Sequence, residues 1–202
     1  MTLWRGTEPL VLASQSRARQ TLLGNAGLNF QTEPAGIDER EIQQKSALSS
    51  PGEIAAHLAR EKSLLVSRRR SGRYVVGADQ ALALGRRLLN KPADRAQAAE
   101  QIGMLAGRTH ELYSAVAVAR DGKIVFENVT IARMTMRRLG RSEIDAYLDE
   151  AGDAVTTSVG AYQLEGLGIH LFEHIEGDHF TILGLPLLAL LAFFRSEGLL
   201  GV

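Results

Sequence analysis

A single aspartate lies in the middle of an otherwise apolar segment, VVGADQALAL, at residues 75–84. Alternation with a period of two puts Gly77 on the same face as Asp79, and Gln80 on the opposite face. A carboxylate in such a segment must be paired, hydrogen-bonded, metal-bound or protonated, because burying an isolated charge is costly. Burial raises the pKa of a carboxyl and a nearby cation lowers it, so Asp79 is a candidate general base toward water. A structural aspartate bonded to a neighbouring turn is the alternative.

Two serines and two arginines follow the first apolar run of the chain, in the segment ASQSRARQTLL. Ser14 or Ser16 is positioned to cap a helix, and backbone N–H groups at a helix N-terminus favour anions. The guanidinium groups of Arg17 and Arg19 can add paired hydrogen bonds to phosphate oxygens. The segment is therefore a candidate phosphate site. Simple helix capping with solvated arginines explains the same residues equally well.

The sequence HLFEH at residues 170–174 matches the H-x-x-E-H pattern of inverted zinc proteases. That pattern needs a helix, which places its two histidines one turn apart. Apolar and polar residues alternate through this stretch, however, which is typical of a strand. On a strand, residues four apart lie roughly 13 Å from each other, too far to share one zinc ion. We therefore reject a zinc site formed by His170, Glu173 and His174.

Strands and helices are interleaved along the chain, and hairpins also occur. Strands are predicted at residues 9–14, 29–34, 75–84, 110–120 and 123–134, and two further short strands are predicted around residues 176–178. Hairpin turns are predicted at Gly85 and at Asp121-Gly122. Helices are predicted after Ser14 or Ser16 as far as 25–27, at 49–72 with a capping box of Ser50 and Glu53, and at 94–107, 141–152 and 186–196. A polar loop is predicted at 36–40. This pattern favours an α/β fold with a mixed sheet and flanking helices. Residues 1–202 are expected to form a single domain, with two lobes and a boundary past residue 140 as an open alternative.

Composition excludes several classes of protein. The 202 residues carry 23 Lys and Arg against 23 Asp and Glu, so no net charge attracts polymeric nucleic acid or a membrane. There is no cysteine, which excludes disulfides and thiolate chemistry. The most apolar stretch, residues 181–194, contains Gly184 and Pro186 and is shorter than the roughly 20 residues needed to span a bilayer. With no signal-peptide pattern at the N-terminus, a cytoplasmic location is expected.

Several short segments, taken together and in order, are more specific than any one of them. They run from about Leu10 to Leu191: LVLASQSRARQTLL, GIDE, LAREK, VVGADQ, NKP, GRTHELYSAVAV, GAYQLEGLG and IEGDHFTILGLPL. This series resembles the Maf family of nucleoside triphosphate pyrophosphatases, whose members are also called septum-formation inhibitors. The resemblance implies an elongated mixed sheet with flanking helices around a central cleft, related to the inosine-triphosphate pyrophosphatases. It also implies cleavage between the α- and β-phosphates with a divalent metal, Mg²⁺ or Mn²⁺, and a homodimer.

The resemblance assigns roles to individual residues. Asp79 falls on the family's proposed general base and is also a candidate metal ligand. The other implied site residues are Ser14, Ser16, Arg19, Lys62 and Lys91 for phosphate and Glu39 for the metal. These types suit the chemistry, because a triphosphate carries about four negative charges that a metal and basic side chains must offset. Magnesium prefers one or two carboxylates together with phosphates and waters.

Departures from the family pattern bear on the choice of base. Where the family shows S-x-S-P-R-R, this chain has Arg17 for the proline and Ala18 for the first arginine. Gln80 and Glu165 resemble the branch that acts on 7-methylguanosine triphosphate. A carboxylate only accepts hydrogen bonds, and guanine offers adjacent N1–H and N2–H donors. We expect a guanine-type or modified purine, although Ala18 replaces the tryptophan common in that branch and cannot stack on a base.

A second function from another class is a nucleotide-binding regulator of cell division without significant catalysis. The complete set of charged residues argues against it, because a protein that only binds a nucleotide does not need a water-activating Asp79. The main expectation is therefore an enzyme that hydrolyses a nucleoside triphosphate to a monophosphate and pyrophosphate.

Overall fold

The computed structural model describes residues 3–46 and 48–201, which form two compact units. Unit 1 contains the described residues up to Gln80, then Tyr113–Thr130, and those from His179 onward. Unit 2 contains Ala81–Leu112 and Ile131–Asp178. The chain therefore changes unit four times, and three long strands each belong to both units. A single domain, with a boundary past residue 140 as the open alternative, stays a prediction. Lobes around a cleft stay a prediction.

The strands form one mixed sheet, as predicted. They are β1 (Leu10–Leu12), β2 (Phe30–Thr32), β3 (Val75–Leu84), β4 (Arg87–Leu89), β5 (Thr109–Arg120), β6 (Lys123–Met136) and β7 (Phe172–Glu176). The order is β2-β1-β3-β5-β6-β7, with β4 paired to β3. β1 runs parallel to β2 and β3, whereas the β3–β4 and β6–β7 pairs are antiparallel. Positive φ angles at Gly85, Asp121 and Gly122 confirm both predicted hairpin turns.

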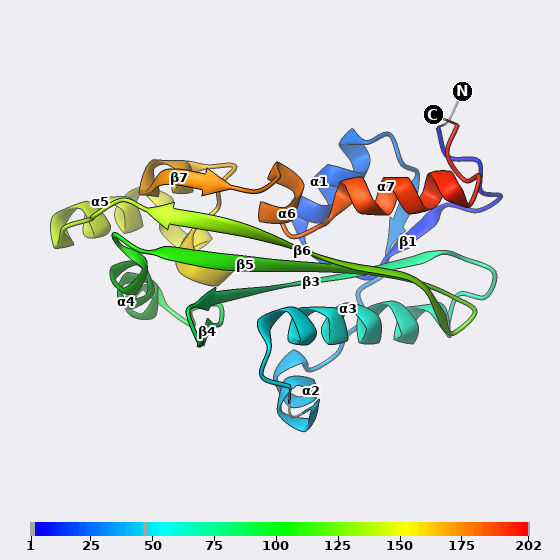
Figure 1. The fold of residues 1–202 in the computed structure, drawn as a ribbon, viewed down its shortest axis with the longest axis horizontal. Helices are drawn as coiled ribbons and strands as arrows, with labels where there is room; N and C mark the ends of the chain where they lie inside the picture. The colour runs from blue at the N-terminus through cyan, green and yellow to red at the C-terminus, as the bar shows by residue number, and fades with distance from the viewer. Residues whose placement is uncertain (1–2, 47, 202) are drawn as a thin grey trace. The chain divides into compact units, whose positions relative to one another are not determined.

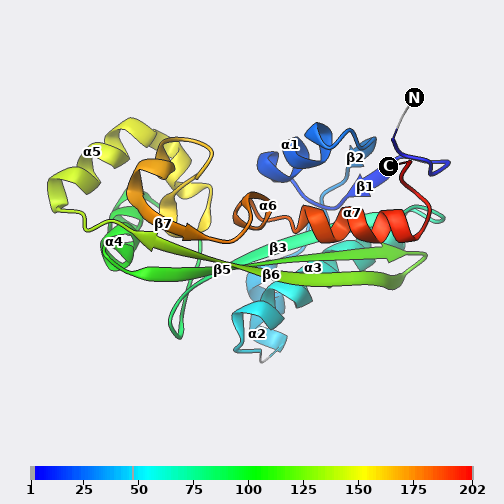
Figure 2. The ribbon, with the colours of Figure 1, turned by 45° about the horizontal axis from the view of Figure 1, so that its top comes forward.

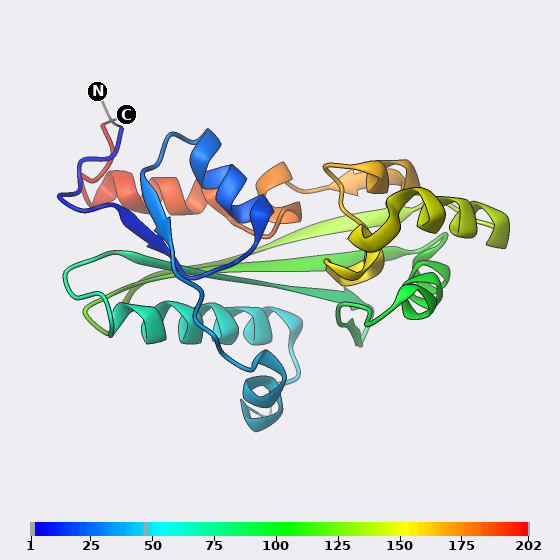
Figure 3. The ribbon, with the colours of Figure 1, turned by 180° about the vertical axis from the view of Figure 1, so that it is seen from behind.

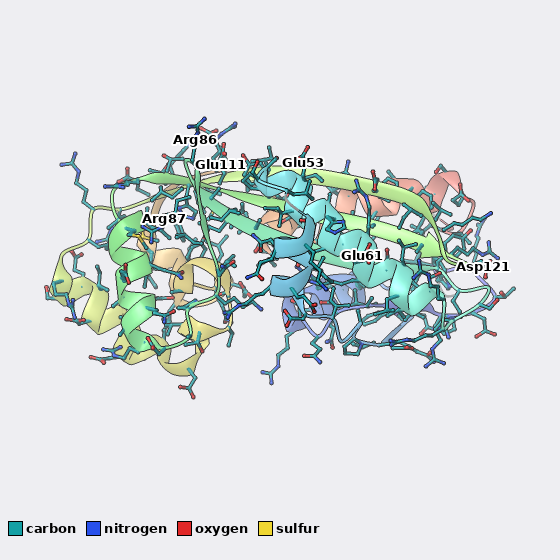
Figure 4. The ribbon with its side chains drawn as sticks, turned by 90° about the horizontal axis from the view of Figure 1, so that it is seen from below. Glu53, Glu61, Arg86, Arg87, Glu111 and Asp121 are labelled. Atoms are coloured by element: carbon teal, nitrogen blue, oxygen red, sulfur yellow. The ribbon has the colours of Figure 1, made fainter. Side chains whose placement is uncertain are left out.

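Helices cover both faces of the sheet in unit 1. On one face lie α1 (Arg17–Asn25), α6 (His179–Ile182) and α7 (Leu187–Ser196), and on the other lies α3 (Pro51–Ser67) (Figure 1, Figure 2). The short helix α2 (Glu39–Ser46) lies beside α3 (Figure 3). Figure 4 shows the side chains from the α3 side, with Glu53 and Glu61 of this helix labelled. Because both faces are covered, β1 and the first half of β3 are almost continuously apolar.

Alternation along the strands sends side chains to two different cores of unit 1. Leu10 and Leu12 of β1 pack with Leu190 and Phe194 of α7. Val11, between the two leucines, faces the opposite way and belongs to a smaller cluster that also contains Ala13, Val66 and Val75. The same alternation in β3 sends Val76 and Ala78 toward the larger core and leaves the opposite face to α3.

Unit 2 is built around α4 (Arg95–Leu105) and α5 (Arg141–Ala151), followed by three short 3₁₀ helices at Gly152–Thr156, Val159–Ala161 and Leu167–Leu171. Asp94 caps α4, since its side chain accepts a hydrogen bond from the backbone N–H of Gln97 at 2.8 Å. The fully buried side chains of unit 2 include Ile102, Leu105, Leu112, Met134 and Met136. Among the described residues, no helix combines the length and the apolar character that crossing a membrane requires.

Three local predictions differ from the structure. Glu39 is the first residue of α2 rather than part of a loop, because Asp38 caps this helix through a 3.0 Å bond from the N–H of Glu41. Ser50 precedes α3 as predicted, but its side chain makes no capping hydrogen bond. The second of the two short strands expected around residues 176–178 is instead the helical turn α6, whose carbonyl groups bond to β3.

Candidate active site

The site is built where α3 presses against β3. Asp79 lies on the β3 face that looks toward α3 and is only 7% exposed. Gly77, two residues earlier on the same face, permits this approach because it has no side chain. A Cβ atom at Gly77 would lie 2.2 Å from the carbonyl oxygen of Ala59 and 2.7 Å from the backbone nitrogen of Ser63. The glycine therefore brings the helix close enough for Lys62 to reach Asp79.

One buried ammonium group joins two carboxylates. The Nζ atom of Lys62 lies 2.6 Å from Oδ1 of Asp79 and 2.7 Å from Oε1 of Glu39. Lys62 and Asp79 are both buried, whereas the side chain of Glu39 is 54% exposed. The acidic group predicted from the strand and the one predicted before α2 thus meet at the same cation.

The pKa of Asp79 is raised by burial, which disfavours the ionised form. The positive charges of Lys62 and Arg19 act in the opposite direction, and the negative charge of Glu39 adds to the rise. A buried carboxylate held between these influences can take a proton from water more readily than an ordinary surface aspartate can.

Arg19 is held rigidly by the protein. Its Nε donates to the carbonyl oxygen of Gly184 at 2.8 Å, and its Nη1 donates to the carbonyl oxygen of Ala78 at 2.9 Å and to Oγ of Ser14 at 3.2 Å. Burial lowers the pKa of Arg19, while attraction by Asp79 and Glu39 raises it. Because an arginine stays protonated in proteins, Arg19 provides a fixed positive charge near Asp79.

The two serines of the first turn have distinct roles. Ser16 caps α1, since its Oγ accepts a hydrogen bond from the N–H of Arg19 at 3.4 Å. Ser14 is buried, and its Oγ accepts from the N–H of Ser16 at 3.2 Å and from the Arg19 side chain. Helix capping is thus confirmed for Ser16, and phosphate binding by either serine stays a prediction.

Gln80 points away from Asp79 and binds the protein itself. Its Nε2 lies 2.9 Å from Oγ of Ser114 and 3.1 Å and 3.0 Å from the carbonyl oxygens of Thr181 and Ile182. Ser114 also donates to the Thr181 carbonyl at 2.6 Å. Sequence reasoning missed this network, although a lone serine in the apolar β5 segment was a signal for it. The specificity role of Gln80 stays a prediction.

The remaining predicted residues are described within their own units. Arg17 is exposed and Ala18 is partly exposed, both on α1. Lys91 and Glu165 belong to unit 2 and are exposed, and their predicted roles stay predictions. Within the described chain, no three His, Cys, Asp or Glu side chains are grouped to hold a metal ion. The strand predicted through the H-x-x-E-H segment begins only at Phe172: His170 lies in a 3₁₀ helix, and Glu173 and His174 lie on β7.

A buried carboxylate that contacts an ammonium group and interacts with a buried guanidinium group suits hydrolysis of an anionic substrate. This defines the class of site. The chain matches the Maf-like protein family model over residues 9–197 and belongs to this family.

Relatives of known name agree with the family assignment. A nucleoside triphosphate pyrophosphatase of Bradyrhizobium diazoefficiens is 69% identical over 202 residues, covering 100% of both chains. A 7-methyl-GTP pyrophosphatase of Brucella abortus is 48% identical over 95% of this chain and 97% of its own. Among solved structures, a HAM1 protein from Coxiella burnetii covers 65% of this chain and 74% of its own, with 16% identity and a TM-score of 0.45. That structural likeness is too low to carry an argument.

Proposed function

We propose that this protein is a nucleoside triphosphate pyrophosphatase, which hydrolyses a nucleoside triphosphate to a nucleoside monophosphate and pyrophosphate. The observation that carries the proposal is the buried Asp79, held by Lys62 and close to the fixed charge of Arg19. Membership of the Maf family and the name of the relative that is 69% identical support the same activity.

Asp79 acts on the attacking water. As its carboxylate accepts a proton, the water oxygen forms a bond to the α-phosphorus, and the bond from that phosphorus to the oxygen bridging toward the β-phosphorus breaks. The pyrophosphate leaves with the electron pair of the broken bond. Burial that raises the pKa of Asp79 makes it a better proton acceptor, while its cationic neighbours Lys62 and Arg19 favour the ionised form that accepts the proton.

Basic groups offset the charge that develops on the leaving pyrophosphate. Lys62 has three N–H donors, and two of them face carboxylates in this structure. The Nε and Nη1 groups of Arg19 donate hydrogen bonds to backbone carbonyl groups of the protein, so Arg19 contributes mainly as a fixed positive charge. The N-terminus of α1, which follows Ser14 and Ser16, is proposed to bind phosphate oxygens through backbone N–H groups. Lys91 is proposed to bind phosphate on the strength of the family resemblance.

The donor set fits a divalent metal, Mg²⁺ or Mn²⁺. Glu39 and Asp79 present two carboxylates that already share one cation, and magnesium is commonly bound by one or two carboxylates plus substrate phosphates. When bound, the metal would neutralise phosphate charge and polarise the reacting phosphoryl group. Glu39 and Asp79 are the residues that would hold it.

Guanine-type or 7-methylguanosine nucleotides are the proposed substrates. Glu165 offers only hydrogen-bond acceptors, which suit the N1–H and N2–H donors of guanine. The relative that is 48% identical is named a 7-methyl-GTP pyrophosphatase, which supports this choice. Gln80 and Ala18 are the other proposed determinants of the base. A homodimer, a cytoplasmic location, and action without a membrane or polymeric nucleic acid also stay predictions.

The proposal is tested with a panel of canonical and modified triphosphates, in the presence of Mg²⁺ or Mn²⁺. Pyrophosphate and the monophosphate should appear in equal amounts, and 7-methyl-GTP or GTP should give the highest kcat/KM. Release of inorganic phosphate instead would place the cleavage at a different bond. Tight nucleotide binding with no product from any triphosphate would favour the alternative, a nucleotide-binding regulator of cell division or septum formation.

A further inference from the structure

Lys62 occupies the place where the charges of Glu39 and Asp79 converge. Its Nζ atom is within hydrogen-bond distance of both carboxylates, at 2.7 Å from Glu39 and 2.6 Å from Asp79. Both carboxylates therefore already have a cation between them. Any divalent ion that binds to the same two oxygen atoms must enter a position that a positive charge holds.

An ammonium group and a divalent ion cannot share this position. Mg²⁺ binds oxygen ligands at about 2.0–2.1 Å, so an ion bound to both of the oxygen atoms that Lys62 contacts would lie close to the Lys62 nitrogen. Like charges at such a separation repel strongly in a partly buried site. Either the lysine leaves, or the metal does not bind to both carboxylates.

The surroundings favour departure of the lysine. Glu39 is the first residue of α2 and its side chain is 54% exposed, so the Glu39 side of the cluster is open to solvent. An ion pair with a half-exposed carboxylate contributes little to stability. The four-carbon stem of a lysine is flexible, so the ammonium group can move while the backbone of α3 stays against β3.

We propose that Lys62 is a displaceable counterion: it holds the cation position between Glu39 and Asp79 until a divalent ion takes that position, and the freed ammonium group then turns to substrate phosphate. This inference rests on the proposed function, for which the divalent ion is the cofactor. It gives Lys62 two successive roles. It also makes the nucleotide-free protein a weak metal binder, so that metal and nucleotide bind more tightly together than separately.

The test is Mn²⁺ binding to nucleotide-free protein, measured at pH 8 by the electron paramagnetic resonance signal of free Mn²⁺. Lys62→Gln should bind Mn²⁺ about tenfold more tightly than the unmodified protein, because a competing charge has been removed. The matched control is Lys45→Gln, which removes one positive charge from the exposed pair with Glu41 on α2. The control should change Mn²⁺ affinity less than about twofold, since exposed pairs are screened.

Unchanged or weaker Mn²⁺ binding by folded Lys62→Gln protein would overturn the proposal, as would an equal gain in the Lys45 control. A second measurement uses the unmodified protein, in case the variant does not fold. Acetylation of each lysine is followed by mass spectrometry with and without Mn²⁺. Lys62 should react several-fold faster with the metal present, and Lys45 should not change. Equal or slower acetylation of Lys62 would contradict displacement.

These outcomes separate the inference from the proposed function. If no triphosphate is hydrolysed but Lys62→Gln still binds Mn²⁺ more tightly, the enzyme assignment fails and the displaceable counterion stands. If pyrophosphate is released normally but the variant gains no affinity for Mn²⁺, only the inference about Lys62 fails.

Discussion

Both units of this protein contain a pair of buried polar side chains in contact, and the two pairs are built differently. In unit 1, Lys62 and Asp79 form a charged pair with a 2.6 Å contact. In unit 2, Nε2 of the fully buried His110 lies 2.7 Å from the hydroxyl oxygen of Tyr162. Burial lowers the pKa of His110 to about 4 and raises that of Tyr162, so the second pair is neutral near pH 7. Similar burial thus produces a charged pair in one unit and a neutral pair in the other.

The two pairs differ in the free energy that their burial costs. A buried ion pair loses the hydration of both charges and stabilises a fold little or not at all compared with an apolar pair. A neutral hydrogen bond avoids that loss and contributes about 1 kcal/mol. The His110–Tyr162 pair therefore suits a structural role beside the tight backbone at Gly160, where φ is 78°. The Asp79–Lys62 pair is better explained by a role in catalysis than by a contribution to stability.

The largest effect should come from removing the charge of Asp79. Asp79→Asn keeps the size of the side chain but cannot accept a proton, so pyrophosphate release should fall roughly a thousandfold, within the range for a lost general base. The measurement is kcat with the best triphosphate of the panel, with nucleotide binding measured in parallel. Asp149→Asn, which removes an exposed carboxylate paired with Arg95, should keep full activity. Near-normal turnover by Asp79→Asn would remove this residue from the chemistry.

Lowering the pH should reduce the free energy of unfolding, because the buried His110 is neutral in the folded protein. His110 has a folded-state pKa of about 4 against an ordinary value of 6.5, so the unfolded chain binds the proton more tightly. Stability contributed by neutral His110 is complete above pH 6.5 and is lost as pH falls toward 4, by about 3 kcal/mol at most. Urea unfolding at pH 7.5 and pH 5 should show this loss.

In His110→Gln the dependence of stability on pH between 7.5 and 5 should become shallower, because the buried group no longer titrates. The control His174→Gln alters a histidine whose side chain is 63% exposed and should leave the dependence unchanged. An equally steep loss in the His110 variant would assign the acid sensitivity to other groups.

A methyl group at Gly77 should separate α3 from β3. The added Cβ would lie 2.2 Å from a backbone oxygen, so Gly77→Ala should destabilise the fold by about 2 kcal/mol and lower activity by moving Lys62 from Asp79. Thermal unfolding and kcat measure the two effects. The matched control is Gly103→Ala in α4, where nothing lies within 4 Å of the added atom. It should stabilise the protein by up to about 1 kcal/mol through helix propensity. Wild-type activity in Gly77→Ala would show that the close contact is not required.

The smallest effect is expected at Glu165 in unit 2. Glu165→Gln exchanges one acceptor for an amide donor, so the ratio of kcat/KM for guanine over pyrimidine triphosphates should fall a few-fold, by about 1 kcal/mol. Overall turnover of the best substrate should change less than it does in Asp79→Asn. A base preference identical to that of the unmodified protein would exclude Glu165 from base selection.

Local signals predicted most of the elements. Asp121-Gly122 predicted the β5–β6 turn, and Ser16 predicted the start of α1, because turns and caps depend on residues a few positions apart. The helix that begins at Glu39 differs from the polar loop predicted at residues 36–40, because the side chain of Asp38 caps this helix through a bond from the N–H of Glu41. The helical turn α6 was missed because its conformation depends on bonds to Gln80, which is a hundred residues earlier in the chain.

The sequence by itself determined that Asp79 would be buried on one face of a strand, since alternation and apolar neighbours are properties of adjacent residues. It also determined the family, through short segments in a fixed order. The fold alone shows that Lys62 is the cation between Asp79 and Glu39, and that Gln80 binds Ser114 and the carbonyl groups of α6. These contacts join segments distant in the chain, and their distances follow from how closely α3 and α6 pack on β3, which no local pattern encodes.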